Sequence, residues 1–257
     1  MCMFDNSNGH AIFATAVNDM PILYKSDAMK QFLITGISGK YKITIKDPTN
    51  TILGLEIERD RANRTIKLRQ RGSMHDLLNE WLPTWDKVDV STLEMIPMQP
   101  AGPLSKEDTK LNLIYCDSRA ITDFASQCGA LNWLSHTSAD FIHATRVLSS
   151  KMSKPTEMDR KRMRHFISCL ARIRRLDLDG LILGGRDGMQ LLSKVDSSHG
   201  MDGLKGRTGG TLHMSPHTGS IMSLCEKQSI TTDSAMACEG VGAHLQVRRV
   251  IPIIFSL

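Results

Sequence analysis

Two acidic side chains, Asp196 and Glu239, are the residues whose types and spacing best suit metal-ion chemistry in this chain. Asp196 ends an apolar, strand-like run over residues 189–196, and Glu239 lies near the start of a helix-like run over residues 234–247. A carboxylate at a strand end and another on the following helix can converge on one divalent cation, because Mg²⁺ prefers hard anionic oxygens. The simpler alternative is an aspartate in a turn and a first-turn glutamate that complements the helix dipole.

The elements that would position this pair form one C-terminal unit, which we expect to begin after the glycine-rich stretch at 180–188. The pattern predicts strands at 207–214 and 218–224 between the two acids, and a last strand at 250–255 after the helix. Such a pair generally works with a third acid. The sequence stops at Leu257, and we expect the third acid to lie beyond that point.

The N-terminal part is predicted to mix short strands with helices. Residues 12–24 are typical of a hairpin with Asn18-Asp19 at its tip, since both residue types tolerate turn conformations. The remaining predictions here are a helix capped by Ser26, paired strands at 51–59 and 64–69, and a helix capped by Ser73.

The middle of the chain is predicted to be helical, with segments at 118–134, 138–152 and 156–176 after a proline-rich loop at 95–106. The third segment carries a basic stretch. Its Arg160, Lys161 and Arg164 fall on the helical face opposite Phe166 and Leu170. This face suits contact with nucleic-acid phosphates, and its alternative is a solvated helix face.

The composition is typical of an intracellular protein with a buried core, and it does not assign a function. The apolar share of 41% supports a buried core, and 32 Lys plus Arg against 27 Asp plus Glu favours polyanionic partners only weakly. The six cysteines form no C-x-x-C pair, so we expect reduced thiols in an intracellular protein. No apolar run approaches the roughly 18 residues of a membrane span, and we expect no membrane partner.

Taken in order, several segments resemble the C-terminal half of a copia-type LTR retrotransposon Pol polyprotein. They are AVNDMPI at 16–22, LGLEI at 53–57, GALNWL at 129–134, LSSKMSKPT at 148–156, VDSS at 195–198, TGG at 208–210 and KQ at 227–228. These segments are similar to the family's YVDDLLI, LGIEV, GALMYL, LSRFMSNPT, VDAS, TGG and KQ.

The resemblance implies a fold of α/β and α+β class. Residues 1–95 would form the end of a reverse transcriptase palm and residues 96–180 a helical thumb and connection. Residues 181–257 would form a truncated RNase H-like domain, with a mixed sheet and one helix.

The resemblance also implies site residues. Asp19 would belong to the polymerase metal site, while Asp196 and Glu239 would hold Mg²⁺ that activates water against an RNA phosphodiester. Asn18 stands where the family has an aspartate, and an amide cannot supply the missing charge. Neither Asp202 nor Asp233 lies where the family places its third RNase H ligand.

These departures predict a degenerate fragment of a reverse transcriptase/RNase H, inactive alone. Its partners would be an RNA/DNA template–primer or RNA–DNA hybrid, and a complementing polyprotein chain. The alternatives are a non-catalytic nucleic-acid-binding protein derived from a retroelement and a relic without a biochemical role.

Overall fold

The computed structural model describes residues 2–7, 9–13, 20–46, 50–99, 105–185, 190–199, 205–215 and 218–254. The chain divides into two compact units, Met1–Ile57 and Glu58–Leu257. The described part is a mixed α/β structure with seven helices and three sheets, in which the strands pair antiparallel. This confirms the predicted mixture of helices and strands. The division into palm, thumb with connection, and RNase H parts stays a prediction.

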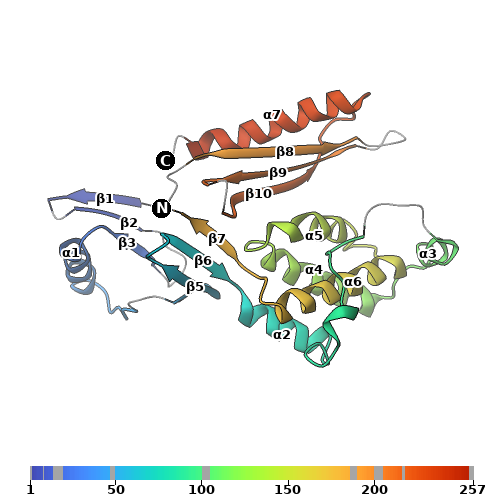
Figure 1. Cartoon of the computed structure of the whole chain (residues 1–257), viewed down its shortest axis with the longest axis horizontal. Helices are drawn as coiled ribbons and strands as arrows, with labels where there is room; N and C mark the ends of the chain where they lie inside the picture. The colour runs from blue at the N-terminus through green and yellow to red at the C-terminus, as the bar shows by residue number, and fades with distance from the viewer. Residues whose placement is uncertain are drawn as a thin grey trace. The chain divides into compact units, whose positions relative to one another are not determined.

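The first unit contains a three-stranded sheet and one helix (Figure 1). Its elements are β1 (Cys2–Asn6), β2 (Gly9–Phe13), β3 (Ile22–Tyr24), α1 (Asp27–Ser38) and β4 (Thr51–Ile52). The pairing of β2 with β3 confirms the predicted hairpin, whose tip at Asn18 and Asp19 lies outside the described residues. Ser26 caps α1 as predicted, because its side chain accepts a hydrogen bond from the Met29 backbone N–H at 3.2 Å.

The unit boundary falls inside β5 (Leu55–Asp60), the second strand of a sheet ordered β4-β5-β6-β7. The second unit contains the remaining elements. They are β6 (Thr65–Arg69), α2 (Arg71–Trp81), the short 3-10 helices η1 (Val90–Thr92) and η2 (Ala139–Phe141), α3 (Lys106–Leu111), α4 (Ser118–Leu134), α5 (Ile142–Ser149), α6 (Glu157–Arg175), β7 (Leu181–Gly184), β8 (Leu192–Ser198), β9 (Arg207–His213), β10 (Ser220–Lys227) and α7 (Ala235–Ile254).

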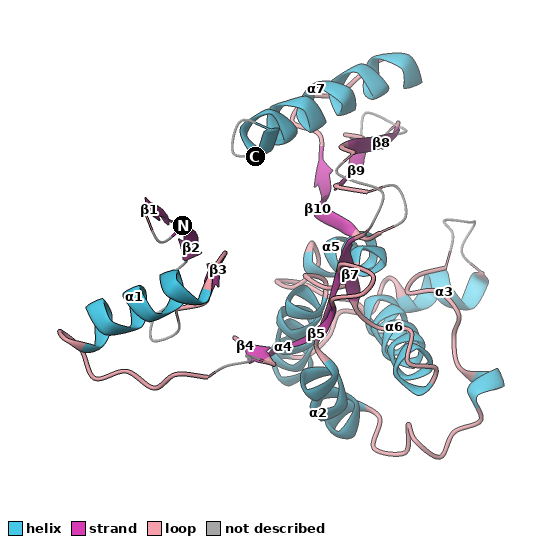
Figure 2. Cartoon of the chain, turned by 60° about the vertical axis from the view of Figure 1, so that its left-hand side comes forward, coloured by secondary structure: helices cyan, strands magenta, loops and turns pink. Residues whose placement is uncertain are grey.

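Helices α2, α4, α5 and α6 of the second unit enclose its hydrophobic core (Figure 2). The rings of Phe141 and Phe166 meet edge to face with their centroids 5.2 Å apart. Leu131 and Leu170 are fully buried beside them. The predicted apolar face of the third helical segment is therefore confirmed as a core face of α6.

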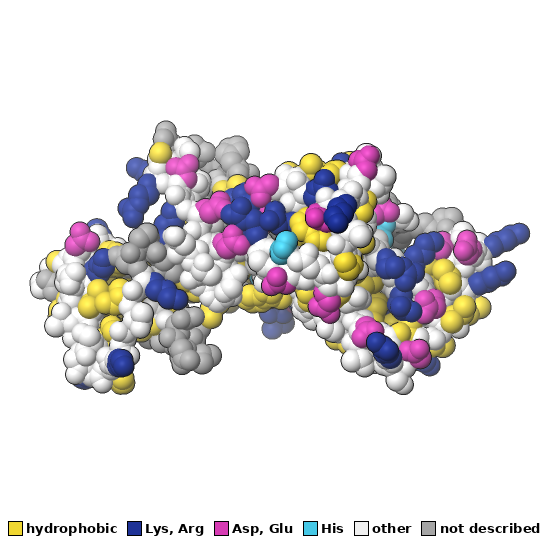
Figure 3. Space-filling view, turned by 90° about the horizontal axis from the view of Figure 1, so that it is seen from below, with side chains coloured by type: hydrophobic (Ala, Val, Ile, Leu, Met, Phe, Trp, Pro, Cys, Tyr) yellow, Lys and Arg dark blue, Asp and Glu magenta, His cyan; other side chains and the backbone are white. Residues whose placement is uncertain are grey.

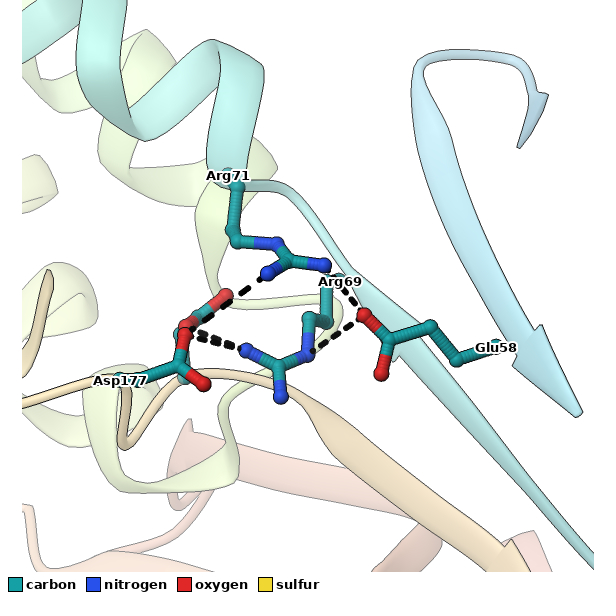
Figure 4. A network of polar contacts seen from close by, with 5 residues as sticks. Glu58, Arg69, Arg71 and Asp177 are labelled. Atoms are coloured by element: carbon teal, nitrogen blue, oxygen red, sulfur yellow. Dashed lines mark hydrogen bonds and ion pairs between the residues drawn. The ribbon is translucent and has the colours of Figure 1, made fainter. Parts of the chain in front are cut away.

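An ion-pair network connects β5, β6 and the segment between α6 and β7 (Figure 4). The buried Arg69 donates to Asp177 Oδ1 at 2.6 Å and to Asp179 Oδ1 at 3.2 Å, and its Nε lies 3.3 Å from Glu58 Oε1. Arg71 also pairs with Glu58. The network joins residues about a hundred positions apart in sequence, so it ties the start of α2 to the end of α6.

A second sheet in this unit has the order β10-β9-β8, with antiparallel pairing throughout, where we had expected a mixed sheet. Helix α7 covers one face of it, and α5 lies against the other face (Figures 1 and 2). Strand β7 pairs with β6 and belongs to the other sheet.

Two local predictions are wrong. Helix α2 begins at Arg71, so Ser73 lies inside the helix and does not cap it. The last strand was predicted at 250–255, but the described residues of this segment are helical. Helix α7 continues to Ile254, with Pro252 inside it. The β-branched residues there favour strands, but Val250 is buried as part of α7, so the tertiary packing of the helix overrides the local preference.

Candidate nucleic-acid interface and the two carboxylates

Asp196 lies inside β8, opposite Gly209 of β9, and not at the strand end. Alternate side chains of a strand point to opposite faces of the sheet. Asp196 lines a cavity together with Ala139 and Ile142, which belong to η2 and α5. The exposed carboxylate of Asp196 therefore lies on the α5 side of the sheet.

Glu239 belongs to α7, which covers the opposite face. Its Oε1 accepts a hydrogen bond from the Ser197 backbone N–H at 3.2 Å. The Ser197 side chain lies on this same α7 side, because its Oγ is 3.0 Å from Thr208 Oγ1 and it contacts Gly242 of the helix. The Asp196 side chain thus lies on the α5 face of the sheet, and the Glu239 carboxylate reaches from α7 to the edge of β8.

The Mg²⁺ site expected at Asp196 and Glu239 stays a prediction. Asp19, the acid expected at the polymerase site, and Asp202 lie outside the described residues, and Asp233 is exposed. Within the described ranges, no group of three or more His, Cys, Asp or Glu side chains is placed to hold a metal ion. We derive no catalytic step through a metal.

The basic stretch predicted to bind phosphates begins at a well-formed helix start. Thr156 caps α6: its hydroxyl accepts from the Asp159 backbone N–H at 3.3 Å, and Asp159 accepts from the Thr156 N–H at 3.0 Å. This reciprocal pair is a capping box. It fixes the first turn of α6, from which Arg160 and Lys161 project.

The three residues predicted to contact phosphates all lie on the solvent side of α6, but their neighbours differ. Arg160 pairs with Glu157 at 3.0 Å, and Lys161 pairs with Asp108 of α3 at 2.8 Å. Hydrogen bonding to Asp108 raises the pKa of Lys161, which therefore stays charged at neutral pH. Arg164 is exposed and has no hydrogen-bond or ion-pair partner among the described residues.

Other cations of this stretch have structural partners. Arg172 donates to the backbone carbonyl of Val90 at 2.6 Å, and Arg175 donates to those of Asp86 and Val88 at 2.6 and 3.0 Å. These two arginines hold the loop that follows α2 against α6. The basic stretch therefore combines a structural C-terminal half with a solvent-facing N-terminal half.

The structure places an aromatic residue beside this N-terminal half, which the sequence analysis missed. Tyr115 is 58% exposed and forms an isolated bridge with Thr156. The Lys154 ammonium lies 4.3 Å from the centre of its ring, within cation–π distance. The sequence signal was the apolar run Leu113-Ile114-Tyr115 just before the Asp117 cap of α4, and all three side chains are exposed.

We call Tyr115, Lys154, Arg160, Lys161 and Arg164 the α6 surface. Figure 3 shows Lys and Arg side chains gathered over the region of α3 and α6, with acidic side chains between them. An exposed ring beside several cations can stack on a base while the cations contact phosphates. The ion pairs of Arg160 and Lys161 are exposed and hence weak, so a phosphate can replace the carboxylate partner at little cost.

None of the described helices combines the length and apolar character needed to cross a bilayer. Comparison with known proteins gives no relative: the chain matches no protein-family model, no curated protein and no solved structure.

Proposed function

We propose that this chain is a non-catalytic nucleic-acid-binding protein that derives from a copia-type reverse transcriptase/RNase H and binds through the α6 surface. The observation that carries the proposal is the exposed Tyr115 ring beside Lys154, next to the helix turn that presents Arg160 and Lys161. The ligand that this chemistry suits is RNA or DNA with unpaired nucleotides, as at the junction of a template and a primer.

A ribonuclease acting alone is the weaker candidate, because no group of three or more His, Cys, Asp or Glu side chains in the described ranges is placed to hold a metal ion. The described cysteines Cys116, Cys128, Cys169, Cys225 and Cys238 are free thiols, which is compatible with the reducing intracellular compartment that we propose for the protein. A complementing polyprotein chain stays a predicted partner.

Fluorescence anisotropy with labelled single-stranded RNA, RNA–DNA hybrid and duplex DNA tests the proposal. We expect binding that weakens linearly in log Kd with log salt concentration. Tyr115→Ala should weaken single-strand binding by about 1–3 kcal/mol if one base stacks on the ring. Tyr41→Ala is the matched control, because Tyr41 is 68% exposed but lies in the first unit.

The same samples test the absence of catalysis. RNA–DNA hybrid incubated with the protein and Mg²⁺ or Mn²⁺ should stay intact. Salt-independent binding, or equal affinity of the Tyr115→Ala variant and the unchanged protein, would contradict the α6 surface, and metal-dependent cleavage would contradict the non-catalytic assignment.

A further inference from the structure

A groove runs between α5 with η2 and the sheet β8–β10, inside the second unit. It consists of two adjoining cavities of about 410 and 330 Å³, each within the size range of small-molecule sites. Both are bounded by Ala139 and Ile142 on the helical side and by Leu224 and Cys225 on the sheet side. We call the two cavities together the α5 groove.

The larger cavity carries two cationic side chains. Lys194 and Arg207 line it, and Arg146 lines the adjoining one. In the described part of the chain, none of the three forms an ion pair, and the Arg207 side chain hydrogen-bonds to the Cys225 thiol. The one carboxylate in the groove is Asp196, so the lining carries a net positive charge that favours an anionic ligand.

His143 and Cys225 meet in the larger cavity, with 3.6 Å between the histidine Nδ1 and the sulfur. Burial, and then the charge of Arg207, lower the pKa of His143. Burial raises the pKa of the Cys225 thiol, while Arg207 beside it acts in the opposite direction. The pair is therefore neutral at pH 7, and the positive charge of the cavity comes from Arg207 and Lys194.

The smaller cavity has a different character. Its polar lining includes the uncharged Asn132, Ser135 and Thr137, each of which also hydrogen-bonds within the protein, and the cation Arg146 at one side. Ile142 and Leu181 supply apolar walls. A flat heteroaromatic ring needs this combination: apolar contact on its faces and uncharged hydrogen-bonding groups at its edges.

From this arrangement we infer that the α5 groove binds a nucleotide, with the phosphate beside Arg207 and the base in the smaller cavity. Asp196 lines the same cavity as Arg207, where its carboxylate can accept hydrogen bonds from sugar hydroxyls. The nucleotide is either free or the phosphorylated end of a strand. This inference does not rest on the proposed function, because the α5 groove and the α6 surface share no residue.

Isothermal titration of the full chain with AMP and UMP tests the inference, with inorganic phosphate as competitor. We expect saturable binding of both nucleotides, weakened at least about tenfold by Arg207→Gln through loss of a charge-assisted contact. Arg146→Gln should act in the same direction. Arg248→Gln is the matched control, because Arg248 is exposed on α7, and it should leave the affinity unchanged.

A second arm identifies the source of the nucleotide. If the ligand is a strand end, a 5′-phosphorylated oligonucleotide binds more tightly than AMP and more tightly than its own unphosphorylated form. If the ligand is a free nucleotide, the oligonucleotide binds no more tightly than AMP. Tyr115→Ala should not change AMP affinity, which separates this site from the α6 surface. The inference is overturned if neither nucleotide binds saturably at millimolar concentration, or if Arg207→Gln keeps full affinity while its thermal unfolding matches that of the unchanged chain.

Discussion

The guanidinium of Arg69 lies 3.2 Å from Asp179 Oδ1, and the two side chains are only 7% and 2% exposed. The other carboxylate oxygen of Asp179 has no hydrogen-bond partner in the described structure. The charge of Asp179 is therefore compensated mainly by Arg69. An exposed pair of this kind would contribute little, but a buried acid that loses its only cation remains uncompensated.

Replacing Arg69 by Met should therefore lower the free energy of unfolding by about 3–5 kcal/mol, as for other buried pairs broken on one side. Urea denaturation measures this loss. Arg71→Met is the control, because Arg71 shares the partners Glu58 and Asp177 but is 32% exposed. We expect it to cost less than about 1 kcal/mol, and an equal loss in the two variants would contradict the special role of Asp179.

Two glycines of α7 should respond oppositely to the same substitution. A Cβ at Gly242 would overlap Ser197 Oγ and lie 3.2 Å from Thr208 Cγ2, whereas one at Gly240 meets nothing within 4 Å. Gly242→Ala should therefore destabilise the fold by about 1–3 kcal/mol through overpacking, and Gly240→Ala should stabilise it by about 0.5–1 kcal/mol through helix propensity. Thermal unfolding of the two variants compares them, and stabilisation by both would show that α7 does not pack closely on β8 and β9.

His143 should make stability depend on pH. Its pKa in the folded chain is lowered from the ordinary 6.5, by burial and by Arg207. The unfolded state then binds a proton more readily than the folded state does. The contribution of His143 to the free energy of unfolding is therefore complete above the unfolded pKa and is lost as the pH falls toward the folded pKa. His143→Gln should reduce the pH dependence of the free energy of unfolding below about pH 6.5. Urea denaturation at several pH values checks this, and an unchanged profile would exclude His143 as its source.

The two carboxylates should behave independently toward metal ions. Because Asp196 faces the α5 side and Glu239 is engaged by the Ser197 N–H at the strand edge, Asp196→Asn, Glu239→Gln and the double variant should leave Mn²⁺ affinity unchanged, as measured by the EPR signal of free Mn²⁺. A site shared by both acids would instead lose its affinity in each single variant. That result would mean that the strand or the helix moves on metal binding.

Local patterns predicted most of the elements. The apolar spacing of Met163, Phe166 and Leu170 located α6. Alternation and turn residues located the hairpin of β2 and β3 and the strands of the last sheet. These signals succeed because each depends on residues close in sequence.

The predictions failed where distant packing decides the outcome. The run from Val250 to Ile254 favours a strand by composition but continues α7, in which Val250 is buried. The face on which Asp196 lies depends on the register of β8 against α5 and α7, which no local pattern encodes. The sequence could therefore predict that a strand carries Asp196 and a helix carries Glu239. It could not predict the direction in which each side chain points.

The hydrogen bond from the Ser197 N–H to Glu239 has a consequence for self-association. Among the described strands, β8 forms an edge of its sheet, and unpaired backbone donors at an edge can recruit a strand from another molecule. Glu239 occupies one of these donors with a charged side chain. Loss of this acid would open a template for intermolecular strand addition, so its effect would first be seen as aggregation at high protein concentration.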